Sequence, residues 1–506
     1  MSSISTAVGL ERKSRTSGYK IKRGNFDNNP RNLPQIIAVL GEANTANQGS
    51  LDLDKKEITT AKEAAELYGY GSPLHQMFRI LRPINGEGVG GIPTIAFPQQ
   101  SDPAATATVH EWTITGVATT NRSHSVVIAG RDSLDFQRYS FSIVKDDDAT
   151  TIASKISDAI NSVLGSPVSA TSALGVVTIT TKWSGQTSAS LVTRFDTGTN
   201  ASGISYSQTA VNEGAGLVSL SNALGQFGNT WYTIVVNQYG EVAFDDLEAF
   251  NGFPDEENPT GRYSGTEFMP FVALFGSVLD DKDDIAAITD NPSRVNQVTN
   301  TLCPAPRSQG FPWEAAANMA SLYARIMQDT PHLDVNNKSY PDMPIPSNGN
   351  IGDMSIYDNR DFLIKKGSST VLLENGTYVV QDFVTTYHPE GESPLQYSYC
   401  RNLNLDWNVS DSYRILETRF VKDHVLIQND QATDVSNAIK PNEWAGIVQE
   451  LFIDLATAGL IKEPQFSRES LKVEIDQNNP DRFNTFFRYK RTGIARIEST
   501  DVEAGF

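Results

Sequence analysis

The chain has 506 residues, of which 39% are hydrophobic and 20% charged, and this length predicts about three folded units rather than a single core. Its formal net charge of −19 at pH 7 argues against nucleic acid as the main ligand, because phosphate binding needs a basic surface. Cys303 and Cys400 are too few for a disulfide framework or a four-cysteine metal site, so we expect a reducing compartment.

The first segment, residues 1–33, is locally positive. It carries seven Lys or Arg residues against two acids, with few apolar residues and no sustained helical period. In an isolated monomer such a tail is expected to be disordered. The alternative is a tether that becomes a strand when it meets the sheet edge of a neighbour.

Folded structure is predicted to begin at Pro34. An apolar run at 35–40 indicates a buried parallel strand. Thr60 and Glu63 have the spacing of a capping box and start a helix through Tyr68. Ser72 precedes a second helix as its N-cap, and residues 92–97 return as a strand. Strand, helices and strand in this order predict an α/β sheet.

The composition changes between residues 99 and 213, where Ser and Thr become frequent and short β-like runs lie between Gly and Asp turns. One helix is expected at 149–164. We interpret this region as a β-rich domain inserted in the α/β sheet. The sheet then resumes with strands at 232–236 and 271–275 and helices at 244–250 and 313–327. Asn375-Gly376 predicts a hairpin with a type I′ turn.

The last part of the chain predicts a helix followed by strands. An apolar stripe runs from Pro441 to Gly459, which can end the helix in a left-handed conformation. Alternating residues then predict strands at 471–475 and 482–490, and residues 494–506 are extended in character. A final strand needs a partner, which another copy of the chain could supply. The five Lys or Arg residues between Arg482 and Arg496, with no acid among them, fit either a solvated surface or an interface with an acidic neighbour.

Motifs for catalysis and metal binding are missing from the sequence. It has no Walker loop, no H-E-x-x-H, no G-x-S-x-G and no paired C-x-x-C, and its six histidines have no metal-ligand spacing. The acidic runs at 280–284 and 146–148 fit the starts of helices better than a cation loop. No apolar run approaches the ~20 residues of a membrane span, and residues 1–24 have no signal-peptide core. We therefore expect no catalytic residue, no cofactor, no metal and no membrane insertion.

Residues 69–79, which include Gly69, Gly71, Ser72 and His75, follow the pattern GxGSxLHxM. This segment resembles one in the Mu-like family of contractile phage tail sheath proteins (myovirus type). Residues 311–317, 375–387 and 488–506 resemble further segments in the family's order. The resemblance covers both ends and the α/β part, whereas 99–213 falls where sheath proteins vary most.

The resemblance implies an α/β multidomain fold with an α/β sheath core, a β-rich inserted domain, an α+β C-terminal domain and extended terminal arms. The expected segments are an N-terminal arm at 1–33, the first part of the core at 34–98, the insert at 99–213, the second part of the core at 214–390, the C-terminal domain at 391–493 and a C-terminal arm at 494–506.

In that family, six-subunit rings stack helically around a tail tube and contract, driving the tube through the host envelope. The implied partners are further copies of the chain, the tail tube protein, and baseplate and tail terminator proteins. The implied location is the virion tail, assembled in the cytoplasm of the host bacterium. The terminal arms would add strands to the C-terminal domains of neighbours.

Carried over to this chain, the resemblance implies two sets of surface residues. The tube-facing candidates are Trp444, Glu450 and Asp454. The expected inter-subunit residues are Ile4, Val8, Leu10, Arg12, Tyr19, Ile21, Leu471, Val473, Ile475, Phe483, Phe487, Tyr489, Ile494, Ile497, Val502 and Phe506.

Other functions stay open at this point. A bacteriocin or secretion-type sheath has the same mechanics and is separated poorly from a phage by sequence. A hydrolase with a subtilisin-like core is a rival, although no recognisable protease triad is present. A surface adhesin would explain the Ser- and Thr-rich insert, but the missing secretion signal counts against it.

Overall fold

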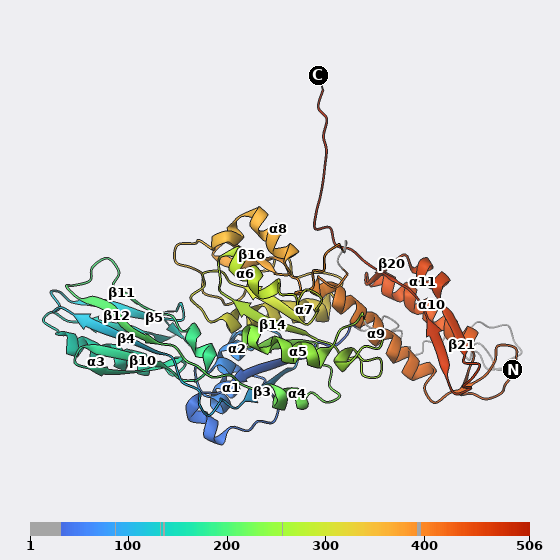
Figure 1. Ribbon diagram of the computed structural model, residues 1–506, viewed down its shortest axis with the longest axis horizontal. Coiled ribbons are helices and arrows are strands. Elements are labelled where there is room, and N and C mark those ends of the chain that lie inside the picture. Colours follow the sequence, from blue (N-terminus) through green and yellow to red (C-terminus); the bar gives the residue numbers. More distant parts are fainter. Residues whose placement is uncertain are drawn as a thin grey trace, which may run out of the picture. The chain divides into compact units, whose positions relative to one another are not determined.

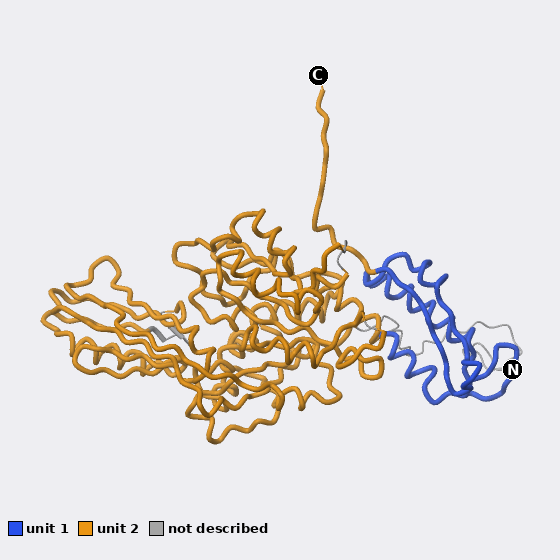
Figure 2. The backbone as a smooth tube through the Cα atoms, viewed as in Figure 1, with its two compact units in different colours: residues 1–31, 412–490 blue, residues 32–411, 491–506 orange. Residues whose placement is uncertain are grey.

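The computed structural model describes residues 32–505 apart from 87, 132, 135–136, 256 and 392–395. The chain divides into two compact units, which Figure 2 colours separately. We call the larger unit, residues 32–411 with 491–506, the body. The smaller unit is the C-terminal module, which the structure describes over 412–490. The six predicted segments remain a prediction.

The centre of the body is a six-stranded sheet, labelled in part in Figure 1. Its strands in spatial order are β15 (Asn300–Pro304), β14 (Val272–Ser277), β13 (Ile234–Asn237), β1 (Ile37–Glu42), β3 (Thr94–Gln99) and β2 (Lys56–Glu57). The first five are parallel, and β2 is antiparallel to β3. The sequence prediction of buried parallel strands in an α/β sheet is confirmed.

Helices cover both faces of this sheet. The side chains of Ile37 and Val39 point into one hydrophobic core, which contains the apolar faces of α2 and α7. Ala38 and Leu40 point into a second core with α4 and α5. Each parallel strand is therefore buried on both sides, which explains its continuous apolar sequence. The helices of the body are α1 (Ala61–Tyr68), α2 (Pro73–Leu81), α3 (Ala149–Asn161), α4 (Ser221–Gly225), α5 (Phe244–Asn251), α6 (Lys282–Thr289), α7 (Pro312–Asp329) and α8 (Tyr357–Lys365).

Side-chain caps begin several of these helices as predicted. The Thr60 hydroxyl accepts a hydrogen bond from the Glu63 amide, and the Ser72 hydroxyl accepts one from the His75 amide. Asp281 caps α6 by accepting from the two amides that follow Lys282. The acidic run at 280–284 is therefore a helix start. Short 3-10 helices connect other elements at η1 (Thr45–Ser50), η2 (Gln186–Ser190), η3 (Gly240–Ala243), η4 (Gly261–Tyr263) and η5 (Gly352–Ser355).

The region between β3 and α4 has sheets of its own and forms a lobe of the body in Figure 1. We call it the insert. Helix α3 packs on its larger sheet, against β9 and β10. A two-residue turn, Leu174-Gly175, joins β9 to β10 with positive φ at both residues. The insert strands are β4 (Val109–Thr115), β5 (Arg122–Ile128), β6 (Ser133–Leu134), β7 (Gln137–Arg138), β8 (Ser140–Ile143), β9 (Val168–Ala173), β10 (Val176–Thr181), β11 (Thr193–Asp196) and β12 (Ser205–Asn212).

The predicted hairpin of the body is present as β16 (Thr370–Glu374) and β17 (Thr377–Asp382). Asn375 and Gly376 both have positive φ, as a type I′ turn requires. Helix α9 (Cys400–Phe420) begins in the body and continues into the C-terminal module. The remaining elements are β18 (Val425–Leu426), β19 (Ala438–Ile439), α10 (Pro441–Thr457), β20 (Ile461–Lys462), α11 (Pro464–Ser470), β21 (Lys472–Ile475), β22 (Phe483–Phe486) and β23 (Lys490–Arg491).

Candidate inter-subunit surfaces

Helix α10 is the core element of the C-terminal module. Pro441 is its first residue, and Gly459 after its end has a φ of 74°, both as predicted. The side chains of Trp444, Val448, Leu451, Phe452 and Leu455 are buried. The apolar stripe read from the sequence is thus the face on which the module packs.

Strands β21 and β22 form an antiparallel pair on this helix, with Val473 opposite Thr485 and Ile475 opposite Phe483. We call this pair the ribbon. Phe487 follows β22 and lies 5.1 Å from the ring of Phe452, centroid to centroid. The predicted residues of the ribbon region are all only half-buried within the chain, namely Leu471, Val473, Ile475, Phe483, Phe487 and Tyr489.

The ribbon has two open edges. Among the residues that the structure describes, β21 pairs only with β22, so each strand leaves one side of its backbone without a ladder partner. An isolated two-stranded sheet is marginally stable, and an open edge can accept a further strand. The ribbon can therefore accept backbone from another segment.

Trp444, one of the predicted tube-facing residues, is buried within the module. Its side chain is 0% exposed, and its indole N–H donates a hydrogen bond of 3.0 Å to Thr485 Oγ1 in the ribbon. It packs inside the module because it belongs to the apolar stripe. Glu450 is exposed and Asp454 partly so. Burial, followed by the nearby Glu450 charge, raises the pKa of Asp454 above its ordinary value.

The chain after the ribbon is held on the body by arginines. The Arg491 guanidinium binds Asp406 with an Nε–Oδ1 distance of 2.7 Å, and buried Arg401 donates to the carbonyl and hydroxyl oxygens of Thr492, each at 2.8 Å. Arg496 pairs with Asp334. We call residues 491–496 the clasp. Its contacts explain why this short stretch lies on the body although it follows the C-terminal module in the chain.

Beyond the clasp, the described residues 497–505 are exposed throughout. We call them the tail. Ile497 is 89% and Val502 82% exposed, although both are large and apolar. The tail carries three acids and no basic residue, and no strand is present in the described part of 494–506. Ile494 is half-buried and belongs to the clasp, and its place in a C-terminal arm that contacts a neighbour stays a prediction.

The remaining predicted interface residues fall outside the described residues. They are Ile4, Val8, Leu10, Arg12, Tyr19, Ile21 and Phe506.

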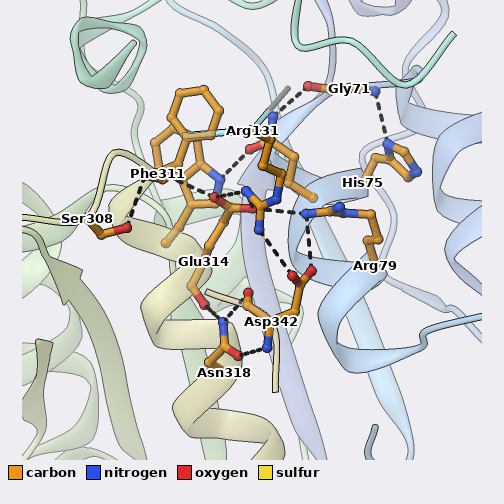
Figure 3. A network of polar contacts seen from close by, with 12 residues as sticks. Gly71, His75, Arg79, Arg131, Ser308, Phe311, Glu314, Asn318 and Asp342 are labelled. Carbon is orange, nitrogen blue, oxygen red and sulfur yellow. Dashed lines mark hydrogen bonds and ion pairs between the residues drawn. The ribbon is translucent and has the colours of Figure 1, made fainter. Parts of the chain in front are cut away.

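A buried ion-pair network joins the insert to the core of the body (Figure 3). Glu314 of α7, whose side chain is 1% exposed, lies 2.9 Å from Arg131 of the insert and 3.1 Å from Arg79 of α2. It also accepts the Phe311 amide at 2.9 Å. Burial alone would raise the pKa of Asp342, but the neighbouring Arg131 and Arg79 lower it below its ordinary value. All four charges are paired, so the network holds the insert in place and offers no unpaired acid or base for catalysis.

Two other potentially reactive side chains, Cys303 and His75, lie in the interior of the body. Burial raises the pKa of the Cys303 thiol well above its usual value, which keeps the thiol protonated and a poor nucleophile. His75 accepts a hydrogen bond from the Gly71 amide inside the body. Within the described ranges, no cluster of three or more His, Cys, Asp or Glu side chains could hold a metal ion. No described helix is long and apolar enough to cross a membrane.

No protein-family model matches the chain. Among curated proteins, it is similar to the Mu-like prophage FluMu tail sheath protein of Haemophilus influenzae, with 23% identity over 454 residues that cover 88% of each chain. This similarity confirms the resemblance to Mu-like tail sheath proteins and supports a structural role in a contractile tail.

Among solved structures, the chain is similar to the sheath tail protein of Desulfitobacterium hafniense, with a TM-score of 0.44 and 10% identity over 93% of this chain and 100% of that one. It is also similar to a chain of the contracted sheath complex of an extracellular contractile injection system, PVC. Here the TM-score is 0.46 and the identity 8%, with 98% of both chains covered.

Proposed function

We propose that this chain, which is similar over most of its length to a Mu-like tail sheath protein, is a structural subunit of a contractile phage tail sheath. Copies polymerise when the tail of one subunit adds a strand to the ribbon of another. The observation that carries this proposal is the presence of both halves of such a joint in one chain. Within the described residues the ribbon has open edges, and the tail exposes the apolar side chains of Ile497 and Val502, which a neighbouring subunit could bury.

Charge supports the match between tail and ribbon. The tail has Glu498, Asp501 and Glu503, whereas Arg482 and Arg488 beside the ribbon are exposed. Opposite charges favour docking and suppress wrong partners. The basic residues between Arg482 and Arg496 fit either a solvated surface or an interface with an acidic neighbour. We therefore adopt the interface.

Strand addition suits a machine that contracts without fuel. Each main-chain hydrogen bond contributes roughly 0.5–1.5 kcal/mol net, so several of them make a joint that survives while folded bodies move. The extended lattice would bury less surface than the contracted one and release the difference on contraction. The remaining parts of the proposal are hexameric rings, N-terminal arms of residues 1–33 as second donor strands, and a tail tube, baseplate and tail terminator as partners. Contraction would drive the tube through the host envelope for genome ejection.

The test is removal of the tail. A chain ending at Arg496 keeps the clasp, so it should fold like the full chain, as judged by circular dichroism and its urea unfolding midpoint. It should form no striated tubes in negative-stain microscopy, whereas the full chain should form them. Tubes of normal length from the shortened chain would disprove tail donation. A full chain that forms no tubes under any assembly condition would count against the sheath itself.

A further inference from the structure

A cavity of about 440 Å³ opens at the carboxyl ends of the parallel strands of the body. Glu42 ends β1, Gln238 directly follows β13, and Gly276 lies near the end of β14. After β1 the chain enters α1 and α2, whereas after β13 it enters α5, and α2 and α5 pack on opposite faces of the sheet. In α/β folds the crevice at such a divergence is where ligands bind.

One residue that lines the cavity, Glu42, has a buried carboxyl group. Glu42 is 1% exposed, and its Oε1 accepts a hydrogen bond of 2.9 Å from Ser101 Oγ. Its Oε2 has only a long contact of 3.3 Å from Gln238 Nε2, which also donates to Thr187 Oγ1 at 2.9 Å. Burial raises the pKa of Glu42 to about 7, so this group lacks a compensating positive charge.

The other residues around the cavity give it a negative and partly apolar wall. Glu241 and Asp246 add two more carboxyl groups, and no Lys, Arg or His is among its described lining residues. Glu241 pairs with Arg294 at 3.2 Å. The apolar lining consists of Leu217, Val218, Leu220, Val242, Ala243, Pro312 and Trp313.

We propose that this cavity binds a small organic cation, an ammonium group carried on an aliphatic chain. The ammonium ion would sit beside Glu42 and supply the missing charge, and the chain would lie against the apolar wall. The volume lies within the roughly 300–1,000 Å³ of small-molecule sites. A metal ion fits less well, because the described residues offer no cluster of three carboxylate, imidazole or thiolate ligands.

The experiment is calorimetric titration of the full chain at pH 8 with cadaverine and, separately, with the neutral 1,5-pentanediol. Cadaverine should bind and pentanediol should not. Glu42→Gln keeps the shape of the side chain and should weaken cadaverine binding at least tenfold. Leu217→Arg places a fixed cation at the wall from a half-exposed position and should do the same. Glu374→Gln, on the exposed hairpin, is the matched control and should change nothing.

Three results would overturn the proposal. One is no binding of cadaverine to the full chain. Another is equal binding of the diol, which would mean that charge is not recognised. The third is unchanged cadaverine affinity in both Glu42→Gln and Leu217→Arg, which would mean that the diamine only coats an acidic surface. None of these results bears on tube formation, so the sheath proposal is tested independently.

Discussion

The guanidinium of Arg496 lies 3.6 Å from the centre of the Tyr399 ring while it pairs with the buried carboxylate of Asp334. This contact is the last one of the clasp, and the exposed tail begins at the next residue. Arg496 therefore marks the point at which the chain stops packing against the body. In the proposed joint, the segment offered to a neighbour would begin at Ile497.

Replacing Arg496 should destabilise the body. In Arg496→Ala the Asp334 carboxylate stays buried without its partner, which costs about 3 kcal/mol, the lower end for a broken buried ion pair. The free energy of unfolding in urea measures the loss. Arg482→Ala removes an exposed arginine of the C-terminal module and should change stability by less than about 0.5 kcal/mol. If both variants lost the same free energy of unfolding, the ion pair of Arg496 would stabilise the body no more than an exposed arginine does.

The tail should respond to charge without affecting the fold. Ile497→Asp and Val502→Asp change side chains that have almost no contact within the chain, so the unfolding midpoint should stay the same. Both substitutions should suppress tube formation, because a buried strand face cannot accept a carboxylate. Tube length in negative stain is the readout. Glu498→Gln is the control and should still allow tubes, and normal tubes from both aspartate variants would contradict tail donation.

Glu42 should make stability depend on pH. Its pKa is raised from 4.5 to about 7 in the folded chain, so the folded state holds the proton more tightly than the unfolded state does. Its contribution to stability is complete below pH 4.5 and is lost as the pH rises through 7, by ~3 kcal/mol in all. Glu42→Gln lacks this loss and should be more stable than the native chain at pH 8 but not at pH 4. Urea midpoints across this range test the sign, and a gap between the two proteins that is constant with pH would refute it.

The two acids of the ion-pair network should contribute unequally to stability. Glu314→Gln leaves Arg79 and Arg131 facing a neutral side chain in a buried site and should cost about 3–5 kcal/mol. Asp342→Asn should cost less, because the Asp342 side chain is 49% exposed and solvent compensates for its loss. Chemical denaturation of both variants gives the comparison. A larger effect at Asp342 would mean that Glu314 is not the centre of the network.

Leu174 is a site where a substitution should stabilise the chain. Its φ is 51° in a type I′ turn, a conformation that costs a bulky residue about 1–2 kcal/mol, and its side chain is 92% exposed. Leu174→Asn should raise the free energy of unfolding by about 1 kcal/mol, since Asn tolerates this conformation. Leu164→Asn, at another exposed leucine without positive φ, serves as the reference and should give no gain.

Local patterns explain what could be predicted from the sequence. Helix α10 is predicted by its apolar stripe, and the β16–β17 hairpin by Asn375-Gly376. Each of these signals lies within the element that it predicts. Helix α9 lacks such a signal. Its buried residues Leu403, Leu405 and Trp407 alternate with polar residues, which is the pattern of a strand. The pattern misleads because polar Asn404 and Asn408 are buried in this part of the helix as well.

Local patterns do not predict contacts between residues that are far apart in the sequence. Arg131 and Glu314 are 183 positions apart, and no local pattern relates the one to the other. The burial of Trp444, in contrast, follows from the local apolar stripe to which it belongs. The clasp had no local signal, because Arg401, Asp406 and Asp334 come from elements far from residues 491–496.

The Leu174-Gly175 turn is also a site at which a foreign peptide could be inserted. A peptide inserted there would lengthen a connection between two paired strands, and each doubling of loop length costs only about 0.6 kcal/mol. The turn lies in the insert, away from the ribbon, the clasp and the tail in sequence. A polymer of such chains would therefore display one epitope per protomer at a spacing set by its own lattice.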